Sequence, residues 1–260
     1  ILTVFLGYIL IPIILSLPHY SFSIPEELKE NVLLSEEELF PYSDLYTDRI
    51  YKIPDAYTVK SEGVSRVLLD VNRAPDDISK EYEGGKDGVM VHKTWNGEQI
   101  YKIEPTEKQF ESLIKKYHDP FHAEIDAYMA DARFLIDCHS YTPVGPPGKP
   151  DEGKPRKDIN LGNVNWTSCT REHTVFFRDF FERHGYSVSI NDPYSGRYIL
   201  GRHCHRKRIP HFLVPGIQIE VNHGLYTEEG TLKAKESEIA EINGLMKKLV
   251  EEVVSKLIPS

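Results

Sequence analysis

Titratable side chains follow five short apolar segments of this sequence, each at the segment's carboxyl end. They include His19, Arg73 and His139, which follow three different segments, and Glu220, which stands near the end of a fourth. Two histidines and a carboxylate are the usual protein ligands of a catalytic zinc ion, which keeps a fourth position for water. A further carboxylate can take a proton from the water, and an arginine can bind a substrate carboxylate through paired hydrogen bonds. These residue types therefore indicate metal-assisted hydrolysis, and the four residues could fill roles of this kind.

Each of these residues also has an ordinary structural explanation. A histidine at the end of a strand is more often a hydrogen-bonded surface residue than a metal ligand, and Asp70 and Arg73 could form an ion pair. Glu220 is harder to explain in this way, because it stands between Ile219 and Val221 in the apolar segment "VPGIQIEVNHGLY". Burying an unpaired charge is costly, so Glu220 must have a strong partner or a function.

Five segments have the short, apolar, β-rich pattern of buried strands. They span residues 12–17, 64–71, 133–138, 186–190 and 212–221. Helical patterns alternate with them, which predicts a mostly parallel sheet with helices on both faces. Open sheets of this kind bind ligands at the carboxyl ends of their strands. The polar residues are therefore expected to meet in one site, provided that the strands are parallel neighbours.

Four stretches carry helical patterns. Ser35 and Glu38 have the spacing of a capping box ahead of a helix through residues 44–51, and residues 105–130 form a long pattern with an expected bend at Pro120. Residues 170–184 place phenylalanines on one face, which is typical of a core helix, and residues 228–257 predict a long surface helix. The Pro/Gly-rich stretch over residues 142–160 is a long loop and a candidate lid.

Two further histidine clusters are weaker metal candidates. His118 and His122 have the i, i+4 spacing of the HExxH zinc helix, but Pro120 lies between them and Asp119 stands where that motif has glutamate. The sequence "HCH" at residues 203–205 lies among arginines and a lysine. Its surroundings favour a solvated basic loop over a second metal site.

Composition limits the class of protein. The 260 residues are enough for one large α/β domain, and we expect a single domain over residues 1–260. The net charge of -9 argues against binding to nucleic acid or to an anionic membrane, although a local basic pocket can still bind a small anionic substrate. Three cysteines without CxxC spacing indicate a cytoplasmic location. Residues 1–17 fit two short strands joined by a turn better than a signal peptide or a membrane span.

Eight segments, in order over about residues 10–226, give the chain a resemblance to the N-formylglutamate amidohydrolase family. They read "LPHYSFSIP", "SDLYTDRIY", "LLDVNRAPDD", "YHDPFHAEI", "IDCHS", "DINLGNVNWTSC", "NDPYSGRYI" and "IQIEVNHGLY". The resemblance implies a zinc-dependent hydrolase of linear amide C–N bonds, typified by conversion of N-formyl-L-glutamate to L-glutamate and formate in histidine degradation. It also implies an α/β fold akin to zinc carboxypeptidases and other phosphorylase/hydrolase-like proteins, with a mixed, mostly parallel central sheet flanked by helices.

The resemblance assigns roles to residues of this chain. It implies one Zn2+ per chain, bound by His19 and His139 and by Asp44 of the segment "SDLYTD". Asp48 in the same segment is the alternative third ligand. Glu220 is implied as the general base that also returns a proton to the leaving group.

Substrate binding is expected to depend on Arg73, which would hold a substrate carboxylate, with Asn72 and Arg197 as further contacts. Two positions depart from the family pattern, because His223 stands where arginine is common and Arg197 where a second glycine is common. The physiological substrate is therefore open. The alternatives are another N-acyl amino acid or a peptide end at the same zinc site, or a binding protein that has lost catalysis. The presence of Glu220 argues against a mere binder, which has no need of a base.

Overall fold

A six-stranded sheet forms the centre of the computed structural model, which describes residues 4–5, 8–77, 88–204 and 214–258. Neighbouring strands are parallel except β6 and β8, which run antiparallel. The predicted mixed, mostly parallel sheet is therefore confirmed. The strand order is β4 (Ala56–Lys60), β3 (Ile11–Leu17), β5 (Phe134–Tyr141), β8 (Gly216–Asn222), β6 (Ile159–Gly162) and β7 (Val188–Ile190).

Two differences from the predicted strands change the sheet. Residues 64–71, predicted as a strand, form turns instead, and most of their apolar side chains pack in a separate hydrophobic cluster. β4 takes the edge position, and β6 lies at the end of the predicted 142–160 loop. A short apolar segment can bury its side chains in turns as well as in a strand, so its pattern does not separate the two. The other predicted strands are confirmed with shifted ends, and residues 212 and 213 lie outside the described residues.

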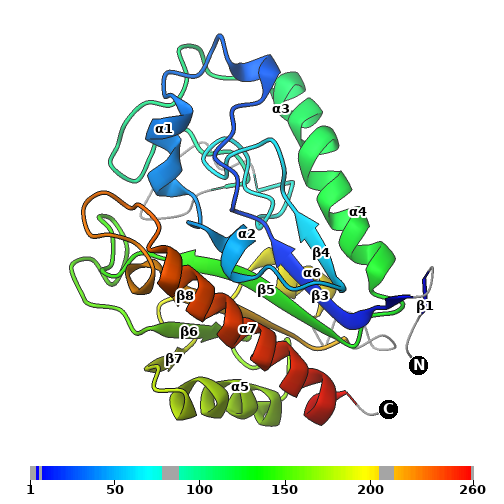
Figure 1. The fold of residues 1–260 in the computed structure, drawn as a ribbon. Helices are drawn as coiled ribbons and strands as arrows, with labels where there is room; N and C mark the ends of the chain where they lie inside the picture. Colours follow the sequence, from blue (N-terminus) through cyan, green and yellow to red (C-terminus); the bar gives the residue numbers. More distant parts are fainter. Residues whose placement is uncertain (1–3, 6–7, 78–87, 205–213, 259–260) are drawn as a thin grey trace.

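Helices cover both faces of the sheet (Figure 1). α5 (Arg171–Arg183) and α7 (Glu236–Leu257) pack on one face, and α4 (Asp119–Tyr128) and α6 (Tyr198–His203) pack on the other. The core helix predicted over residues 170–184 is confirmed. The helix predicted over residues 228–257 begins later and buries one side against the sheet. None of the helices in the described ranges is long and apolar enough to cross a membrane.

The helix predicted over residues 105–130 consists of three consecutive segments. α3 (Glu107–Leu113) continues through a π-helical segment (Ile114–His118) into α4. Pro120 stands in the first turn of α4, where the missing N–H of a proline costs no hydrogen bond within that helix. The irregularity expected at Pro120 is therefore a change of helix type just before it.

Short elements precede the sheet and lead into the site. β1 (Val4–Phe5) and β2 (Tyr8–Ile9) form an antiparallel pair ahead of β3, so the N-terminal segment holds three strands where two were predicted. The predicted capping box is present and begins α1 (Glu36–Leu39). The helix predicted over residues 44–51 is limited to α2 (Thr47–Ile50), which leaves Asp44 in the preceding loop. Short 3-10 turns occur at η1 (Glu26–Leu28), η2 (Phe40–Tyr42) and η4 (His223–Leu225).

Side-chain alternation along the central strands creates one polar patch on the sheet. The apolar residues of β8 face α5 and α7, so Gln218 and Glu220 face the opposite side. β5 alternates in the same way and places Asp137 and His139 beside them. In the parallel register, Asp137 pairs with Gln218 and His139 pairs with Glu220. The patch lies toward the carboxyl ends of both strands, where open sheets bind their ligands.

Candidate active site

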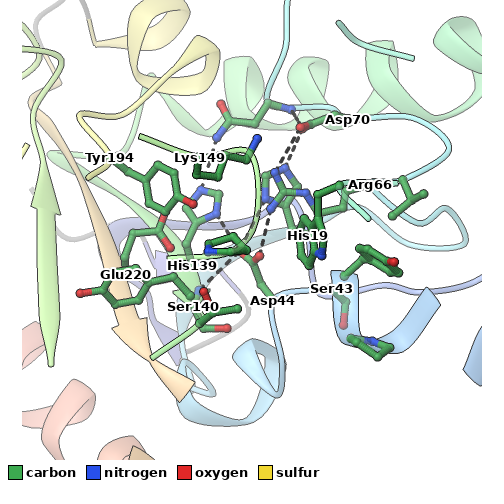
Figure 2. A pocket seen from close by; sticks show the side chains of 18 of the residues that line it. His19, Ser43, Asp44, Arg66, Asp70, His139, Ser140, Lys149, Tyr194 and Glu220 are labelled. Carbon is green, nitrogen blue, oxygen red and sulfur yellow. Dashed lines mark hydrogen bonds and ion pairs between the residues drawn. The ribbon is translucent and has the colours of Figure 1, made fainter. Parts of the chain in front are cut away.

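Three residues from separate parts of the chain form a buried cluster at the carboxyl end of the sheet (Figure 2). His19 follows β3, Asp44 precedes α2 and His139 lies in β5. Ligand atoms from the three side chains all lie within 4.8 Å of one another, and no other such group of three occurs among the described residues. The structure thus brings together the three residues implied as metal ligands, and Asp48 is not part of the group.

The two histidines are oriented by carboxylates on their outer sides. His19 Nε2 lies 2.6 Å from Asp70 Oδ1, and His139 Nε2 lies 3.1 Å from Asp137 Oδ2. The Nδ1 atoms therefore turn inward, at 3.5 Å and 2.8 Å from Asp44 Oδ2. Histidines that bind metals usually donate their other ring N–H to a carboxylate or carbonyl in this way, which fixes the tautomer and the ring orientation.

The donor set fits a divalent metal ion. His19 Nδ1 is buried and has no hydrogen-bond partner among the described residues. An unpaired buried polar atom is costly, and a cation between the two Nδ1 atoms and the Asp44 carboxylate would supply the missing partner. Two imidazole nitrogens and one carboxylate oxygen are also the ligand types of a catalytic zinc site with an open position.

Charge in the cluster favours ionised carboxylates. Burial by itself would raise the pKa of Asp44, but His19 and His139 outweigh that effect and hold the pKa below its ordinary value. Burial would lower the pKa of His139, yet its contacts with Asp137 and Asp44 outweigh that effect and raise it. The Asp44 carboxylate is therefore available as a metal ligand at neutral pH.

Arg66 belongs to the site although the sequence pattern did not identify it. Its Nη1 donates to Asp44 Oδ1 at 3.1 Å, and its Nη2 donates to Asp70 Oδ2 at 3.4 Å. The guanidinium therefore joins the carboxylate of the cluster to the carboxylate that orients His19. It lies in the segment that was predicted as a strand, and it carries no motif that would single it out.

Glu220 lies beside His139 at the same cavity (Figure 2). Its side chain is buried, and its Oε1 accepts a hydrogen bond of 2.8 Å from the neutral amide of Gln218. Burial raises the pKa of Glu220 to about 8, with His139 acting in the opposite direction. No ion pair joins Glu220 to a cation in the part of the chain that the structure describes. The ion pair that a purely structural role would require is therefore not found there.

The cavity in front of the cluster is small and lined by cations. Its volume is about 140 Å³, below the roughly 300–1,000 Å³ of pockets for drug-sized ligands. Arg73 lies in the wall with its Nε 3.6 Å from Asp70 Oδ2, and it is almost fully buried. Lys93, Lys149 and Arg197 also line the cavity. Arginine and lysine side chains therefore line this cavity together with the carboxylates of Asp44, Asp70 and Glu220.

Asn72 lines the cavity but contacts the cluster with its amide. Its Nδ2 lies 3.5 Å from Asp137 Oδ2 and 3.4 Å from His139 Nε2, and its Oδ1 accepts from the Ile199 N–H at 2.9 Å. The structure thus places this predicted substrate-binding residue at the cavity, with its amide nitrogen donating to Asp137, the carboxylate that orients His139.

The 142–160 loop contributes Lys149 and Arg156 to the cavity wall. Arg156 lies over the rings of Tyr141 and Tyr194, with its Cζ 5.2 Å and 5.1 Å from their centroids. Its Nε and Nη2 donate to the Asp151 carboxylate at 2.6 Å and 3.1 Å. The sequence did not identify Arg156 and Tyr194, because the 3.1 Å contact between them joins two distant segments, and the role of the loop as a lid stays a prediction.

The other histidine clusters make structural contacts. His118 Nε2 and His122 Nε2 bind the backbone carbonyls of Arg73 and Val71, at 2.9 Å and 2.8 Å. His203 is buried in α6, so a solvated loop was the wrong interpretation for this residue. Cys204 is buried as well, and residues 205–208 of that basic segment lie outside the described residues.

Comparisons with known proteins give the family of the chain and agree with its fold. The model of the N-formylglutamate amidohydrolase family matches residues 11–227. A crystal structure of N-formylglutamate amidohydrolase from Ralstonia eutropha JMP134 is similar, with a TM-score of 0.76, 21% identity and coverage of 95% of each chain. A gene product of Agrobacterium tumefaciens has a TM-score of 0.71 and 21% identity, over 95% of this chain and 92% of that one. No curated protein sequence matches the chain.

Proposed function

The chain belongs to the N-formylglutamate amidohydrolase family, an amidohydrolase family that acts on amide C–N bonds, and from this premise we propose a zinc-dependent reaction on a small N-acylated acidic amino acid. The typical reaction would convert N-formyl-L-glutamate and water to L-glutamate and formate. The observation that carries the proposal is the buried group of His19, Asp44 and His139, whose inward ring nitrogens and carboxylate have the donor types of catalytic zinc.

The three residues would hold one Zn2+ per chain. The ion would polarise the acyl carbonyl and lower the pKa of a water molecule. Asp70 and Asp137 keep the ligand histidines in the required tautomer, and Arg66 keeps Asp44 in position.

Glu220 would act as the general base. It would take a proton from the attacking water as the new C–O bond forms at the acyl carbon. It would then give that proton to the amine as the C–N bond breaks. Burial raises its pKa to about 8, and a divalent cation beside His139 would lower it toward the neutral range in which a general base is most effective.

The small cavity and its cations support an acidic substrate over a peptide. We propose that Arg73 binds a substrate carboxylate and that Arg197, which is exposed at the cavity wall, contacts the outer end of the substrate. A guanidinium matches a carboxylate through two parallel hydrogen bonds. Burial lowers the pKa of His223 to about 4, so its side chain is uncharged at neutral pH. This uncharged ring lines the cavity at the position where arginine is common in the family.

Metal analysis combined with a substrate screen tests the proposal. We expect about one zinc per purified chain and fastest turnover of N-formyl-L-glutamate among N-formyl and N-acetyl amino acids. Preference for neutral or long peptide substrates would favour the alternative deacylase or carboxypeptidase-like function. Binding of acidic substrates without any turnover by the zinc-loaded protein would favour the inactive binding protein.

Substitution Arg73→Lys is expected to weaken binding of acidic substrates. Lysine keeps the charge but loses the planar pair of donors, which costs about 1.5–3 kcal/mol for a hydrogen bond to a charged group. Steady-state kinetics should show a raised KM with acidic substrates. Arg178→Lys, an exposed arginine paired with Asp179, is the matched control and should change nothing. Wild-type KM values for every acidic substrate in Arg73→Lys would contradict the assignment.

A further inference from the structure

Two histidines of one helical stretch bind the backbone on either side of Asn72. His122, in α4, binds the carbonyl of Val71, and His118, in the π-helical segment before α4, binds the carbonyl of Arg73. Both side chains are buried, at 2% and 1% exposure. Carbonyl oxygens only accept hydrogen bonds, so both rings carry a proton on Nε2 and act as donors.

The backbone segment held in this way supports the candidate metal site. Asp70 orients His19 through a contact of 2.6 Å, and the side chain of Asn72 lies against His139 and donates to Asp137, the carboxylate that orients His139. Asp70 Oδ1 also accepts from the Asn72 N–H at 2.8 Å, which ties the two supporting residues together. A shift of this segment would therefore move partners of both ligand histidines at once.

His203 connects the helical stretch to α6. Its Nε2 lies 2.9 Å from His122 Nδ1, and its Nδ1 lies 3.0 Å from Asp126 Oδ1. The rings of His122 and His203 are stacked, with an angle of 18° between their planes. Arg202 also donates to Asp126 at 3.0 Å. The contacts form a continuous chain from the Asp126 carboxylate on α4, through α6, to the Val71 carbonyl.

A second metal ion does not fit these contacts. The two ring nitrogens that face one another, on His122 and His203, are already within hydrogen-bond distance. The remaining nitrogen of His122 is bound to a carbonyl, and that of His203 faces a carboxylate. Each of these nitrogens therefore has a protein partner.

We propose that His118, His122 and His203 are positioning residues, which hold the Asp70–Arg73 backbone so that both ligand histidines keep their orientation. The expected effect on zinc binding rests on the proposed function, because it needs the metal site to exist. The expected effect on the backbone of residues 70–73 holds with or without that site.

Substitution His122→Leu tests the proposal, with His122→Gln as the conservative variant, because the glutamine amide can still donate to the Val71 carbonyl. Hydrogen exchange on the full chain reports on the Asn72, Arg73 and Ile199 amides, which are bonded to Asp70 and Asn72. The Leu135 amide of β5 serves as the reference. We expect the leucine variant to exchange at least tenfold faster at the three reporters relative to the reference, and the glutamine variant to remain near wild type.

Zinc affinity is the second readout. Loss of a residue that orients metal ligands typically weakens metal binding about 10–100-fold. We expect this loss in His122→Leu and its rescue in His122→Gln. Val253→Ala, a core substitution in α7, is the control for lowered stability and should leave both readouts unchanged.

The proposal would be overturned if a folded His122→Leu protein kept the wild-type exchange ratios. It would also be overturned if His122→Leu and His122→Gln lost exchange protection and zinc affinity to the same extent. If His122→Leu does not fold, His118→Leu decides the question by the same two readouts, because its target is the carbonyl of Arg73. Wild-type protein that binds no divalent metal would refute the proposed function instead, and the exchange ratios would still decide the positioning role.

Discussion

Substitution Glu220→Gln is expected to lower kcat by about a hundredfold or more, the usual contribution of general acid–base catalysis, while zinc and substrate still bind. Glutamine has nearly the same shape, and its carbonyl oxygen can still accept the hydrogen bond from Gln218. It cannot take a proton from water. The substitution would therefore remove the proton acceptor next to His139 and preserve the packing of the side chain.

Kinetics, zinc content and thermal midpoint measured on one preparation separate this role from a structural one. A structural carboxylate predicts lowered stability with little change in kcat per folded molecule. Glu36→Gln is the matched control, because Glu36 accepts a hydrogen bond from the Ile24 N–H and does not line the cavity. Near-normal kcat in Glu220→Gln with a full complement of zinc would reject the mechanism.

The parts of the site that lie on regular strands were predictable from the sequence. His139 and Glu220 end apolar segments that become β5 and β8, and the parallel register places them side by side. His19 follows β3 for the same reason. Alternation with a period of two and the geometry of parallel sheets were sufficient for these three residues. Asp44 precedes a helix of only four residues, so no periodic pattern marks it and only the family resemblance pointed to it.

The remaining parts of the site depend on contacts between distant segments. Arg66 meets Asp44 and Asp70 only after residues 64–71 fold into turns, and those residues have the apolar pattern of a strand. β4 has an alternating burial pattern at the edge of the sheet, where fewer apolar residues are needed than in a central strand. Sequence periodicity reports burial, and it does not report which buried segments form turns or which arginine meets which carboxylate.

Substitution His139→Ala is expected to reduce bound zinc and turnover together. The ring supplies one of two inward nitrogens, and its loss would leave one histidine and one carboxylate, which is fewer protein ligands than catalytic zinc sites use. His19→Ala should have the same effect. His184→Ala is the control, because this exposed histidine bonds the Phe180 carbonyl on α5, away from the site. Undiminished zinc in both ligand variants would refute the assignment.

Asp44 and Asp48 can be separated by the same measurement. Asp44→Ala should lose zinc, whereas Asp48→Ala should keep it, since only Asp44 lies in the cluster. Retained zinc in Asp44→Ala with loss in Asp48→Ala would reverse the assignment.

Metal removal should also destabilise the wild-type protein, because the unfolded chain does not hold the three ligands together. Zinc at a hundred times its Kd contributes about 2.7 kcal/mol of stability. For a chain of this size that corresponds to a shift of roughly 5–10 °C in Tm. Thermal unfolding with and without a chelator should show this shift in wild type and His184→Ala. It should be absent in His139→Ala, because a site that no longer binds zinc has no binding energy to lose.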